Sequence, residues 1–384
     1  MPRVSIIVPA RNAEDTLEQT LASALSQTER DLEVVVLDDG SDDATAAIVE
    51  RLARSDHRVR LLQQAASGVA AARNAAIAAS TGEFIAPLDA DDLWAPTKIE
   101  RQLARFASAS PRTGLVYAWS IVIDEEGRPI MRAPAWRLEG CVLPMLATFH
   151  FLGSASSPLI LRRVIEEVGG YDVELRARGA QGCEDWDLAL RIAARHEFAL
   201  APGYLVGYRR RATSMSSDVG AMWRSYASVM ARLAQVHPDL PAPLFRWSRS
   251  GFQRYLAGLS GDTRRALRWT GRAIQTDPSL LLSRSALAEM LGATARALLE
   301  PLLAPNGSRR RSWLQLAVAP PRCAAPQLLW GLGAEDERAL PWNEDRSLHG
   351  RLCRTRWRVA ERYAERMASG SAELRTGDPV TVER

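Results

Sequence analysis

The chain has 384 residues, 47% of them hydrophobic and 24% charged, which is typical of a globular protein with a large core and room for two domains. The formal net charge is +4 and the basic residues are spread along the sequence, so nucleic acid is not indicated as a partner. The widely separated cysteines include no Cys-x-x-Cys pair and favour a reducing compartment, and neither a signal peptide nor a membrane-spanning segment is predicted.

The first elements alternate between buried strands and amphipathic helices. Residues 4–8 form a continuous apolar run, which is typical of a strand buried on both faces, and Pro9 ends it. We expect Asn12 to cap a helix whose apolar stripe begins at Leu17. A second buried strand is predicted at 33–37.

The alternation continues beyond this second strand. A helix is expected to start at Asp42 or Asp43, followed by a strand at 59–62, a helix at 68–79 and a strand at 83–88. Repeated strand–helix–strand units of this kind predict an α/β fold with a doubly wound, mostly parallel sheet.

Three carboxylates, Asp89, Asp91 and Asp92, follow the strand that ends at Leu88. Ligands of open α/β sheets bind at the carboxyl ends of the strands, and hard carboxylate oxygens suit Mg²⁺ or Mn²⁺. The loop therefore indicates a site for a metal-bound phosphate ester. The alternative is a solvated acidic turn before the helix that follows Pro96, because Asp is common at helix starts.

The next segment contains further strand and helix patterns. Residues 114–123 predict a strand that returns through a hairpin. Residues 133–156 are irregular and rich in Pro, Gly and Ser, and we assign them to acceptor binding because long irregular stretches inside domains are often functional. A helix is expected at 184–192 and a strand at 198–208, with a turn at Pro202.

Strand patterns stop after about Ser216. Helical patterns then occupy 222–236, 244–259, 263–276, 280–299 and 351–367. We expect residues 1–216 to form the α/β domain and residues 217–384 to form a mainly helical C-terminal appendage. We expect the appendage to pack on the first domain. A further hypothesis is that it positions an acceptor or docks on a membrane or partner.

Five motifs follow one another along the first part of the chain. They are Val4-Ser5-Ile6-Ile7-Val8-Pro9 with Asn12; Val36-Leu37-Asp38-Asp39-Gly40-Ser41 with Asp43; Ala72-Arg73-Asn74 followed by Thr81-Gly82-Glu83; Leu88-Asp89-Ala90-Asp91-Asp92; and Gly170-Tyr171-Asp172 leading to Glu184-Asp185-Trp186-Asp187. In this order they resemble the inverting family 2 glycosyltransferases with the GT-A fold. Each motif alone is weak, whereas the ordered set is specific.

The resemblance implies a glycosyltransferase of the hexosyltransferase type. The donor would be a nucleotide-diphosphate sugar, expected to be a UDP-sugar, and the acceptor a hydroxyl of a glycan or lipid-linked oligosaccharide. Transfer would be a single inverting displacement with Mn²⁺ or Mg²⁺ as cofactor. Such enzymes without a membrane span imply a cytoplasmic protein, and peripheral contact with the inner membrane surface is compatible with this expectation.

The resemblance also assigns roles to individual residues. It places the metal at Asp91, with Asp92 supporting the metal or capping the next helix. It places the nucleotide at Pro9, Asp39, Arg73 and Asp89. Chemically, Asp39 can accept a hydrogen bond from a uracil N–H or a ribose hydroxyl, and Arg73 can donate to a base carbonyl or a phosphate. Alternatively, Asp39 shapes the Asp-Gly turn and Arg73 is a surface residue.

One position departs from the family pattern. The run Tyr208-Arg209-Arg210-Arg211-Ala212-Thr213-Ser214-Met215-Ser216 matches a motif that often has His where this chain has Arg211. Arginine has no lone pair for a metal, so we place Arg211 against the leaving diphosphate as a fixed positive charge. A solvated basic turn is the alternative.

The candidate general base is Asp185, at the expected start of a helix. A carboxylate there is exposed and held by backbone N–H groups, and it can take the proton of an acceptor hydroxyl. Glu184 is the competing candidate, and the resemblance favours the second acidic residue. Structurally, both residues could simply populate the first turn of the helix.

Two other functions fit parts of the sequence. A nucleotidyltransferase would share the α/β core and the metal-binding aspartates, but it should carry a Gly-rich loop after the first strand, where this chain has Pro9-Ala10-Arg11-Asn12-Ala13-Glu14. A catalytically inactive nucleotide-sugar-binding protein is the non-enzymatic alternative, suggested by Arg211 and the helical appendage.

Overall fold

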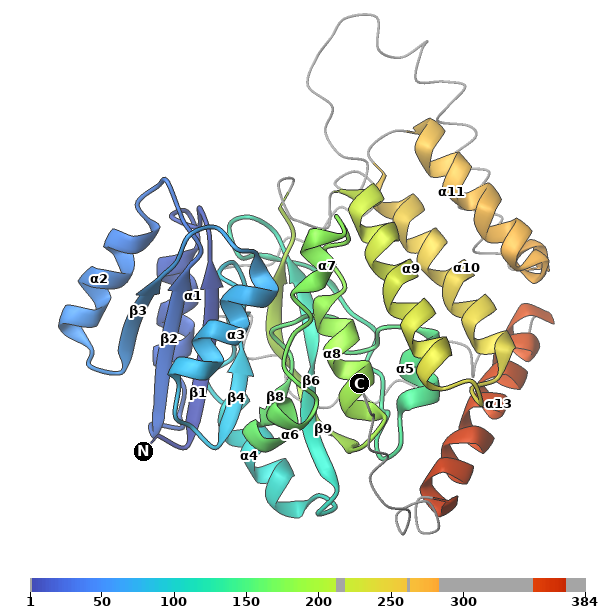
Figure 1. Ribbon diagram of the computed structural model, residues 1–384, viewed down its shortest axis with the longest axis horizontal. Helices are drawn as coiled ribbons and strands as arrows, with labels where there is room; N and C mark the ends of the chain where they lie inside the picture. Colours follow the sequence, from blue (N-terminus) through green and yellow to red (C-terminus); the bar gives the residue numbers. More distant parts are fainter. Residues whose placement is uncertain (1, 212–217, 261–262, 283–347, 371–384) are drawn as a thin grey trace, which may run out of the picture.

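The computed structural model describes residues 2–211, 218–260, 263–282 and 348–370. A curled mixed sheet forms the centre of the molecule, and a group of helices from the second half of the chain lies at one end of it (Figure 1). Within the described residues, no helix is long and apolar enough to cross a membrane.

The sheet is parallel where the sequence predicts alternating strands and helices. Its order is β3-β2-β1-β4-β8-β6-β9-β5, with β7 paired to β6. β1, β2, β3 and β4 are parallel to one another, and β9 is parallel to β6. β8 runs antiparallel between β4 and β6, which makes the sheet mixed. The strands are β1 (Val4–Ala10), β2 (Leu32–Asp38), β3 (Val59–Gln63), β4 (Phe84–Pro87), β5 (Leu93–Trp94), β6 (Thr113–Ile123), β7 (Pro129–Arg132), β8 (Leu159–Leu161) and β9 (Glu197–Arg209).

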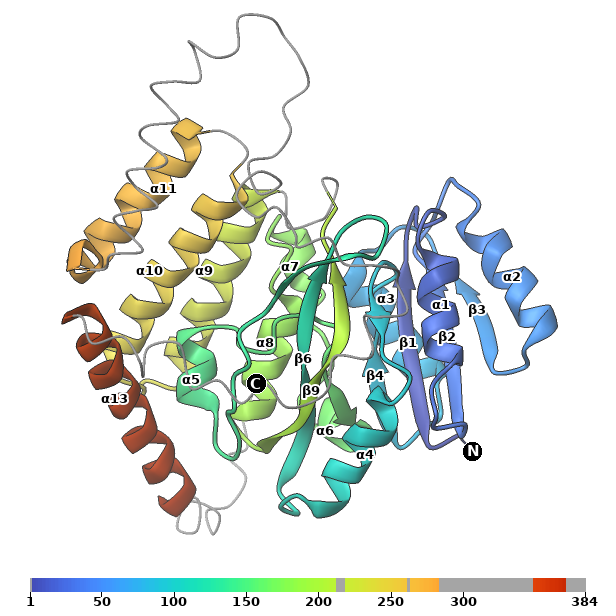
Figure 2. The ribbon, with the colours of Figure 1, turned by 180° about the vertical axis from the view of Figure 1, so that it is seen from behind.

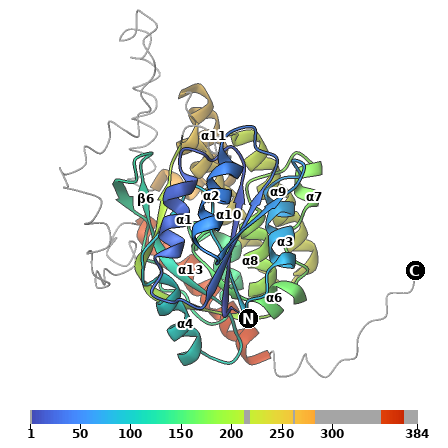
Figure 3. The same cartoon turned by 90° about the vertical axis from the view of Figure 1, so that its left-hand side faces the viewer.

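Helices cover both faces of the sheet, and Figures 2 and 3 show α1 and α3 on opposite sides of the strands. The helices of the α/β part are α1 (Leu17–Leu25), α2 (Thr45–Ser55), α3 (Val69–Ala79), α4 (Lys98–Ser108), α5 (Leu143–Thr148), α6 (Arg162–Glu167), α7 (Glu174–Ala177) and α8 (Glu184–Ala193). Alternate residues of β1 divide between two cores: Ile6 packs with α1, α2 and α4, whereas Ile7 packs with α3 and α8. The period of two in a strand thus buries both faces of β1.

The predicted cap of the first helix is wrong. Asn12 has a positive φ of 49° and lies before the helix, and its Oδ1 accepts a hydrogen bond from the Asp42 backbone N–H at 2.9 Å. α1 begins at Leu17, and the hydroxyls of Thr16 and Thr20 donate hydrogen bonds to the backbone oxygen of Ala90, both at 3.0 Å. Tertiary contacts between loops therefore override the local capping pattern.

The last strand also differs from the sequence prediction. β9 runs without interruption from Glu197 to Arg209, although a turn was predicted at Pro202. The strand passes Gly203 with a φ of 144° and changes register against β6 in this region. A bulge within a long strand therefore replaces the turn.

The helices after β9 pack side by side and continue the core of the sheet (Figure 1). They are α9 (Val219–Val236), α10 (Ala242–Leu259), α11 (Thr263–Thr276), a 3₁₀ helix (Pro278–Leu282) and α13 (Leu348–Gly370). Most of the helix predicted at 280–299 lies outside the described residues, as does Ser216, at which the domain boundary was placed.

Candidate active site

The acidic loop connects β4 to β5 at the carboxyl end of the parallel strands. Asp89 accepts a hydrogen bond from the Arg73 guanidinium at 2.5 Å, and Asp91 lies half-buried beside it. Burial and the charge of Asp89 raise the pKa of Asp91 to about 6, while Arg211 and Arg209 act in the opposite direction. The loop therefore brings several carboxylates together where water solvates their negative charge poorly.

Asp92 is the anchor of this loop. It is fully buried, its Oδ2 accepts hydrogen bonds from the hydroxyls of Ser154 and Ser156 at 2.9 and 2.6 Å, and its Oδ1 accepts one from the Arg209 backbone N–H at 3.0 Å. The predicted capping of the next helix is wrong, because α4 starts at Lys98, beyond β5. Both oxygens already accept hydrogen bonds from the protein, so this geometry favours a supporting position over direct metal ligation.

Sequence reasoning missed Arg209. Its guanidinium is 1% exposed and donates to the backbone oxygen of Asp91 at 2.7 Å, to that of Asp124 at 3.2 Å and to Gln19 Oε1 at 2.7 Å. It therefore holds the backbone of the acidic loop from the last strand. The strand period could have separated inward-facing Arg209 from Arg210, but the run of three arginines obscured it.

Arg211 extends toward the same loop. Its guanidinium pairs with Asp15 at 2.9 Å, and its positive charge acts on Asp91. Residues 212–217 of the motif lie outside the described part of the chain. The described portion thus brings a positive charge near the acidic loop, and the position of Arg211 against a leaving diphosphate stays a prediction.

Asp39 holds the loop in front of α3. Its Oδ1 accepts hydrogen bonds from Gln64 Nε2 and the Ser67 backbone N–H, both at 2.7 Å, and its Oδ2 accepts one from the Gly68 backbone N–H at 2.8 Å. Pro9 lies nearby on β1, in register with Leu37 of β2. Asp39 therefore fixes the loop in front of α3, and its carboxylate lies at the carboxyl end of β2.

Arg73 connects the two halves of the site. It comes from α3, is 4% exposed, and lies over the ring of Tyr171 at 5.1 Å while pairing with Asp89. The charges of Asp89 and Asp185 both raise the pKa of the guanidinium against its burial. Its buried Nε has no hydrogen-bond partner among the described residues, so one donor of the guanidinium is unsatisfied.

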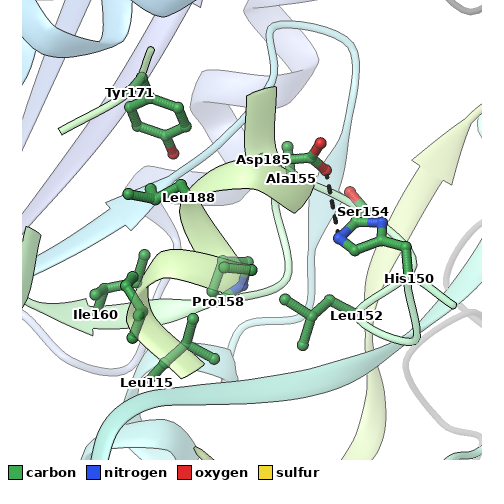
Figure 4. Close-up of a pocket in the computed structure, with 12 residues that line it drawn as sticks. Leu115, His150, Leu152, Ser154, Ala155, Pro158, Ile160, Tyr171, Asp185 and Leu188 are labelled. Carbon is green, nitrogen blue, oxygen red and sulfur yellow. Dashed lines mark ion pairs between the residues drawn. The ribbon is translucent and has the colours of Figure 1, made fainter. Parts of the chain in front are cut away.

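Asp185 and Glu184 begin α8 but face different surroundings. Glu184 is 3% exposed, its Oε2 accepts a hydrogen bond from the Gly182 backbone N–H at 2.8 Å, and burial raises its pKa. The Asp185 side chain is 25% exposed and its Oδ1 accepts a hydrogen bond from the Trp186 backbone N–H at 2.8 Å. Asp185 lines a recess that also contains Tyr171 and His150 (Figure 4). Asp185 is thus the more accessible of the two carboxylates.

Residues 5–165 match the family described as Glycosyl transferase family 2. This segment belongs to that family. Within it lie Pro9, Asp39, Arg73, Asp89 and Asp91, whereas Asp185 and Arg211 follow it in the chain.

Curated relatives of known name are similar to part of the chain. Over 102 residues the chain is 45% identical to the UDP-Glc:alpha-D-GlcNAc-diphosphoundecaprenol beta-1,3-glucosyltransferase WfgD of Escherichia coli, covering 26% of this chain and 40% of that protein. Over 136 residues it is 34% identical to chondroitin synthase of Pasteurella multocida (strain Pm70), covering 35% of this chain and 14% of that protein. The chain therefore spans less than half the length of either relative.

A solved structure extends the similarity of fold beyond the family 2 segment. S. aureus TarS 1-349 in complex with UDP aligns with a TM-score of 0.50 at 17% identity, covering 81% of this chain and 95% of that chain. The likeness confirms the predicted GT-A fold with its helical C-terminal portion.

Proposed function

We propose that this protein is a metal-dependent inverting glycosyltransferase. It transfers a sugar from a nucleotide-diphosphate donor to a hydroxyl of a glycan or lipid-linked oligosaccharide in a single displacement. The proposed catalytic domain is residues 1–216. The family 2 assignment supports the reaction class, and the curated relatives, which include an enzyme named for a diphosphoundecaprenol-linked acceptor, support the acceptor class.

The position of Arg73 carries this proposal. One buried guanidinium contacts Asp89 at 2.5 Å and lies within electrostatic reach of Asp185, so the acidic loop and the candidate base belong to a single site. Arg73 itself is proposed to donate to the nucleotide. A displacement needs a leaving-group site and a base on opposite faces of the reacting carbon, and this arrangement supplies candidates for both.

The donor is proposed to be a UDP-sugar. The 45% identical relative from Escherichia coli is named for a UDP-glucose donor, and the segment that matches the family model contains Asp39 and Arg73. Asp39 Oδ2 accepts one hydrogen bond from the Gly68 backbone N–H, whereas a carboxylate oxygen can accept two. The remaining lone pair suits a uracil N–H or a ribose hydroxyl, and Pro9 is proposed to border the same nucleotide site.

The acidic loop fits a divalent cation. Burial first, and then the charge of the neighbouring carboxylates, raise the pKa of Asp91 and of buried Asp92, and a bound cation would offset both effects. Among the described residues, no group of three or more His, Cys, Asp or Glu side chains is placed to hold a metal ion. Mg²⁺ is often bound by one or two carboxylates together with substrate phosphates. Asp91 is proposed to hold Mn²⁺ or Mg²⁺, which when bound neutralises negative charge on the leaving diphosphate.

Asp185 is proposed to accept the proton of the acceptor hydroxyl. As that proton moves to the carboxylate, the acceptor oxygen forms a bond to the anomeric carbon on the face opposite the diphosphate. The bond between the anomeric carbon and the phosphate oxygen breaks, and the electron pair leaves with the nucleotide diphosphate. Arg211 is proposed to stay as a fixed positive charge beside the departing phosphates.

The test is release of nucleotide diphosphate from a panel of UDP-, GDP- and dTDP-sugars with lipid-linked acceptors and Mn²⁺ or Mg²⁺. Asp91→Ala should reduce transfer by at least about a hundredfold, because negative phosphates leave slowly without charge neutralisation. Excess EDTA should do the same to the wild-type protein, and added metal should restore it. Full activity in EDTA would refute the metal requirement.

The alternative functions give different results in this panel. A catalytically inactive nucleotide-sugar-binding protein would bind UDP with metal but release none from any donor. A nucleotidyltransferase would instead release pyrophosphate from a nucleoside triphosphate and a sugar phosphate. Flotation of the protein with vesicles that contain anionic lipids tests the proposed peripheral contact with a membrane.

A further inference from the structure

His150 lies in the loop that follows α5 and faces the candidate base. Its Nε2 is 3.7 Å from Asp185 Oδ2, and the close-up in Figure 4 shows the imidazole directed at that carboxylate. The side chain is 20% exposed, so the pair is partly shielded from water. This histidine belongs to segment 133–156, in which no individual residue stands out from the sequence. The prediction that this segment is irregular is wrong in part, because it contains α5.

Packing fixes the direction of the imidazole. The ring stacks on Trp186, the residue after Asp185, with centroids 5.5 Å apart and an interplanar angle of 29°. The Trp186 indole N–H donates to the backbone oxygen of Leu146 in α5 at 2.8 Å, which ties the same loop to α8. His150 and Asp185 therefore keep their relative position through one shared aromatic neighbour.

His150 and Asp185 each have one polar atom that faces the other at 3.7 Å, beyond hydrogen-bond distance. Asp185 Oδ1 accepts a hydrogen bond from the Trp186 backbone N–H, whereas Oδ2 faces His150. The buried Nε2 of His150 has no hydrogen-bond partner among the described residues. A movement of roughly half an ångström would bring Nε2 and Oδ2 to hydrogen-bond distance, and catalytic hydrogen bonds often tighten only when substrate binds.

The protonation state of the ring suits a donor. Burial lowers the pKa of His150, and the negative charge of Asp185 acts in the opposite direction. The ring is then neutral near pH 7 and carries its single proton on one nitrogen. A proton on Nε2 gives the buried nitrogen a partner in Asp185 Oδ2, whereas a proton on Nδ1 would place two lone pairs against each other.

We propose that His150 is a positioning residue for Asp185, an inference that rests on the proposed function. Its Nε2–H donates to Oδ2 and, together with the Trp186 backbone N–H, holds the carboxylate plane so that a free lone pair meets the acceptor hydroxyl. The proton of that hydroxyl moves to Asp185, and His150 keeps its own proton throughout. The orientation of the base is thus set from the acceptor-side loop.

Three variants separate this positioning from simple packing. His150→Phe keeps the stacking on Trp186 but lacks the N–H, and it should lower kcat for transfer by about 10- to 100-fold, with KM for the donor and the Kd of UDP unchanged. His150→Gln supplies an N–H at a similar reach and should stay within a few-fold of wild type. His57→Gln, at an exposed histidine, is the matched control and should behave as wild type. Near wild-type activity of His150→Phe, or equal losses in the Phe and Gln variants, would overturn the proposal.

A second measurement does not need activity. In ¹⁵N-histidine-labelled full-length protein, the NMR signals of His150 should report a proton on Nε2, and Asp185→Asn should lower the pKa of His150 because the carboxylate charge is removed. An Nδ1 tautomer or an unchanged titration would refute the pairing. If the pairing is present while the wild-type protein releases no nucleotide diphosphate from any donor, the proposed function fails instead.

Discussion

Adjacent carboxylates at the start of α8 show how packing separates two chemically similar residues. Glu184 turns into the protein and accepts a backbone hydrogen bond, whereas Asp185 remains accessible at the recess beside Tyr171. A general base must reach its substrate, so accessibility rather than charge separates the two candidates.

Exchanging each carboxylate for its amide tests this difference. Asp185→Asn should lower transfer by at least about a hundredfold, because a positioned base contributes roughly 10² to 10⁴ in rate. UDP and metal binding should persist, as measured by calorimetry. Glu184→Gln is the matched control and should retain most of the activity if it folds. The assignment of the base would move to Glu184 if the two results were reversed.

Asp39 is proposed to contribute both to the fold and to nucleotide recognition. Asp39→Asn keeps the size of the side chain but removes one acceptor, and UDP binding measured by calorimetry should weaken by about 1 to 3 kcal/mol. Asp38→Asn is the control, because Asp38 Oδ1 accepts from the Ser41 hydroxyl and backbone N–H. Tighter binding of GDP than of UDP to the wild-type protein would contradict the proposed pyrimidine preference.

At the scale of elements, α4 contains a fully buried lysine. Lys98, the only lysine of the chain, is fully buried, donates to Gln102 Oε1 at 2.8 Å and lies 3.9 Å from the centroid of the Trp94 ring. Burial lowers its pKa well below the usual value, since ammonium is poorly solvated there. An amphipathic pattern predicts the helix but does not show that this lysine faces the core.

The lowered pKa of Lys98 makes the free energy of unfolding depend on pH. Between the lowered pKa of folded Lys98 and its usual value near 10.5, the unfolded chain binds more protons, so stability should rise with pH. The rise approaches about 1.4 kcal/mol per pH unit for one proton. Thermal unfolding from pH 7 to pH 10 should show it in the wild-type protein relative to Lys98→Met. Parallel curves for the two proteins would mean that Lys98 keeps an ordinary pKa.

Local patterns predicted the elements better than their ends and contacts. The buried runs of β1 and β2 are fixed by their own apolar residues, and the ordered motifs indicated the GT-A fold. Thr16, just before α1, donates a hydrogen bond to Ala90, far along the chain, and the uninterrupted course of β9 includes a change of register against β6. Arg209 and His150 acquire their surroundings from distant segments. The strand period could separate Arg209 from Arg210 but does not show what Arg209 contacts, and no local pattern singles out His150.

At the scale of the whole molecule, the helical region shares one core with the sheet. Tyr226 of α9 and Phe252 of α10 lie 5.7 and 5.9 Å from the Trp186 ring of α8, measured between centroids. Arg232 of α9 pairs with Asp172 and with buried Asp187. These contacts support packing as a role of the region, since the neighbours of the candidate base form part of the same interface.

A chain that ends after Ser216 should therefore fail to fold stably. Truncation exposes Trp186 and neighbouring apolar residues of α5 and α8, and each large buried side chain contributes about 1.5 to 3 kcal/mol against a typical total of 5 to 15 kcal/mol. We expect loss of cooperative thermal unfolding together with loss of both transfer and donor hydrolysis.

Single substitutions in α10 of the full-length chain test how much this packing contributes to the free energy of unfolding. Phe252→Ala should lower the free energy of unfolding by about 3 to 5 kcal/mol, because it opens a cavity beside Trp186. Tyr255→Ala, on the same helix but 45% exposed, should change it by less than about 1 kcal/mol. If the truncated chain instead unfolds cooperatively and hydrolyses donor while transfer is lost, the helices serve the acceptor rather than the core. That outcome would favour the acceptor-positioning hypothesis, because it would separate the chemistry at the donor from recognition of the second substrate.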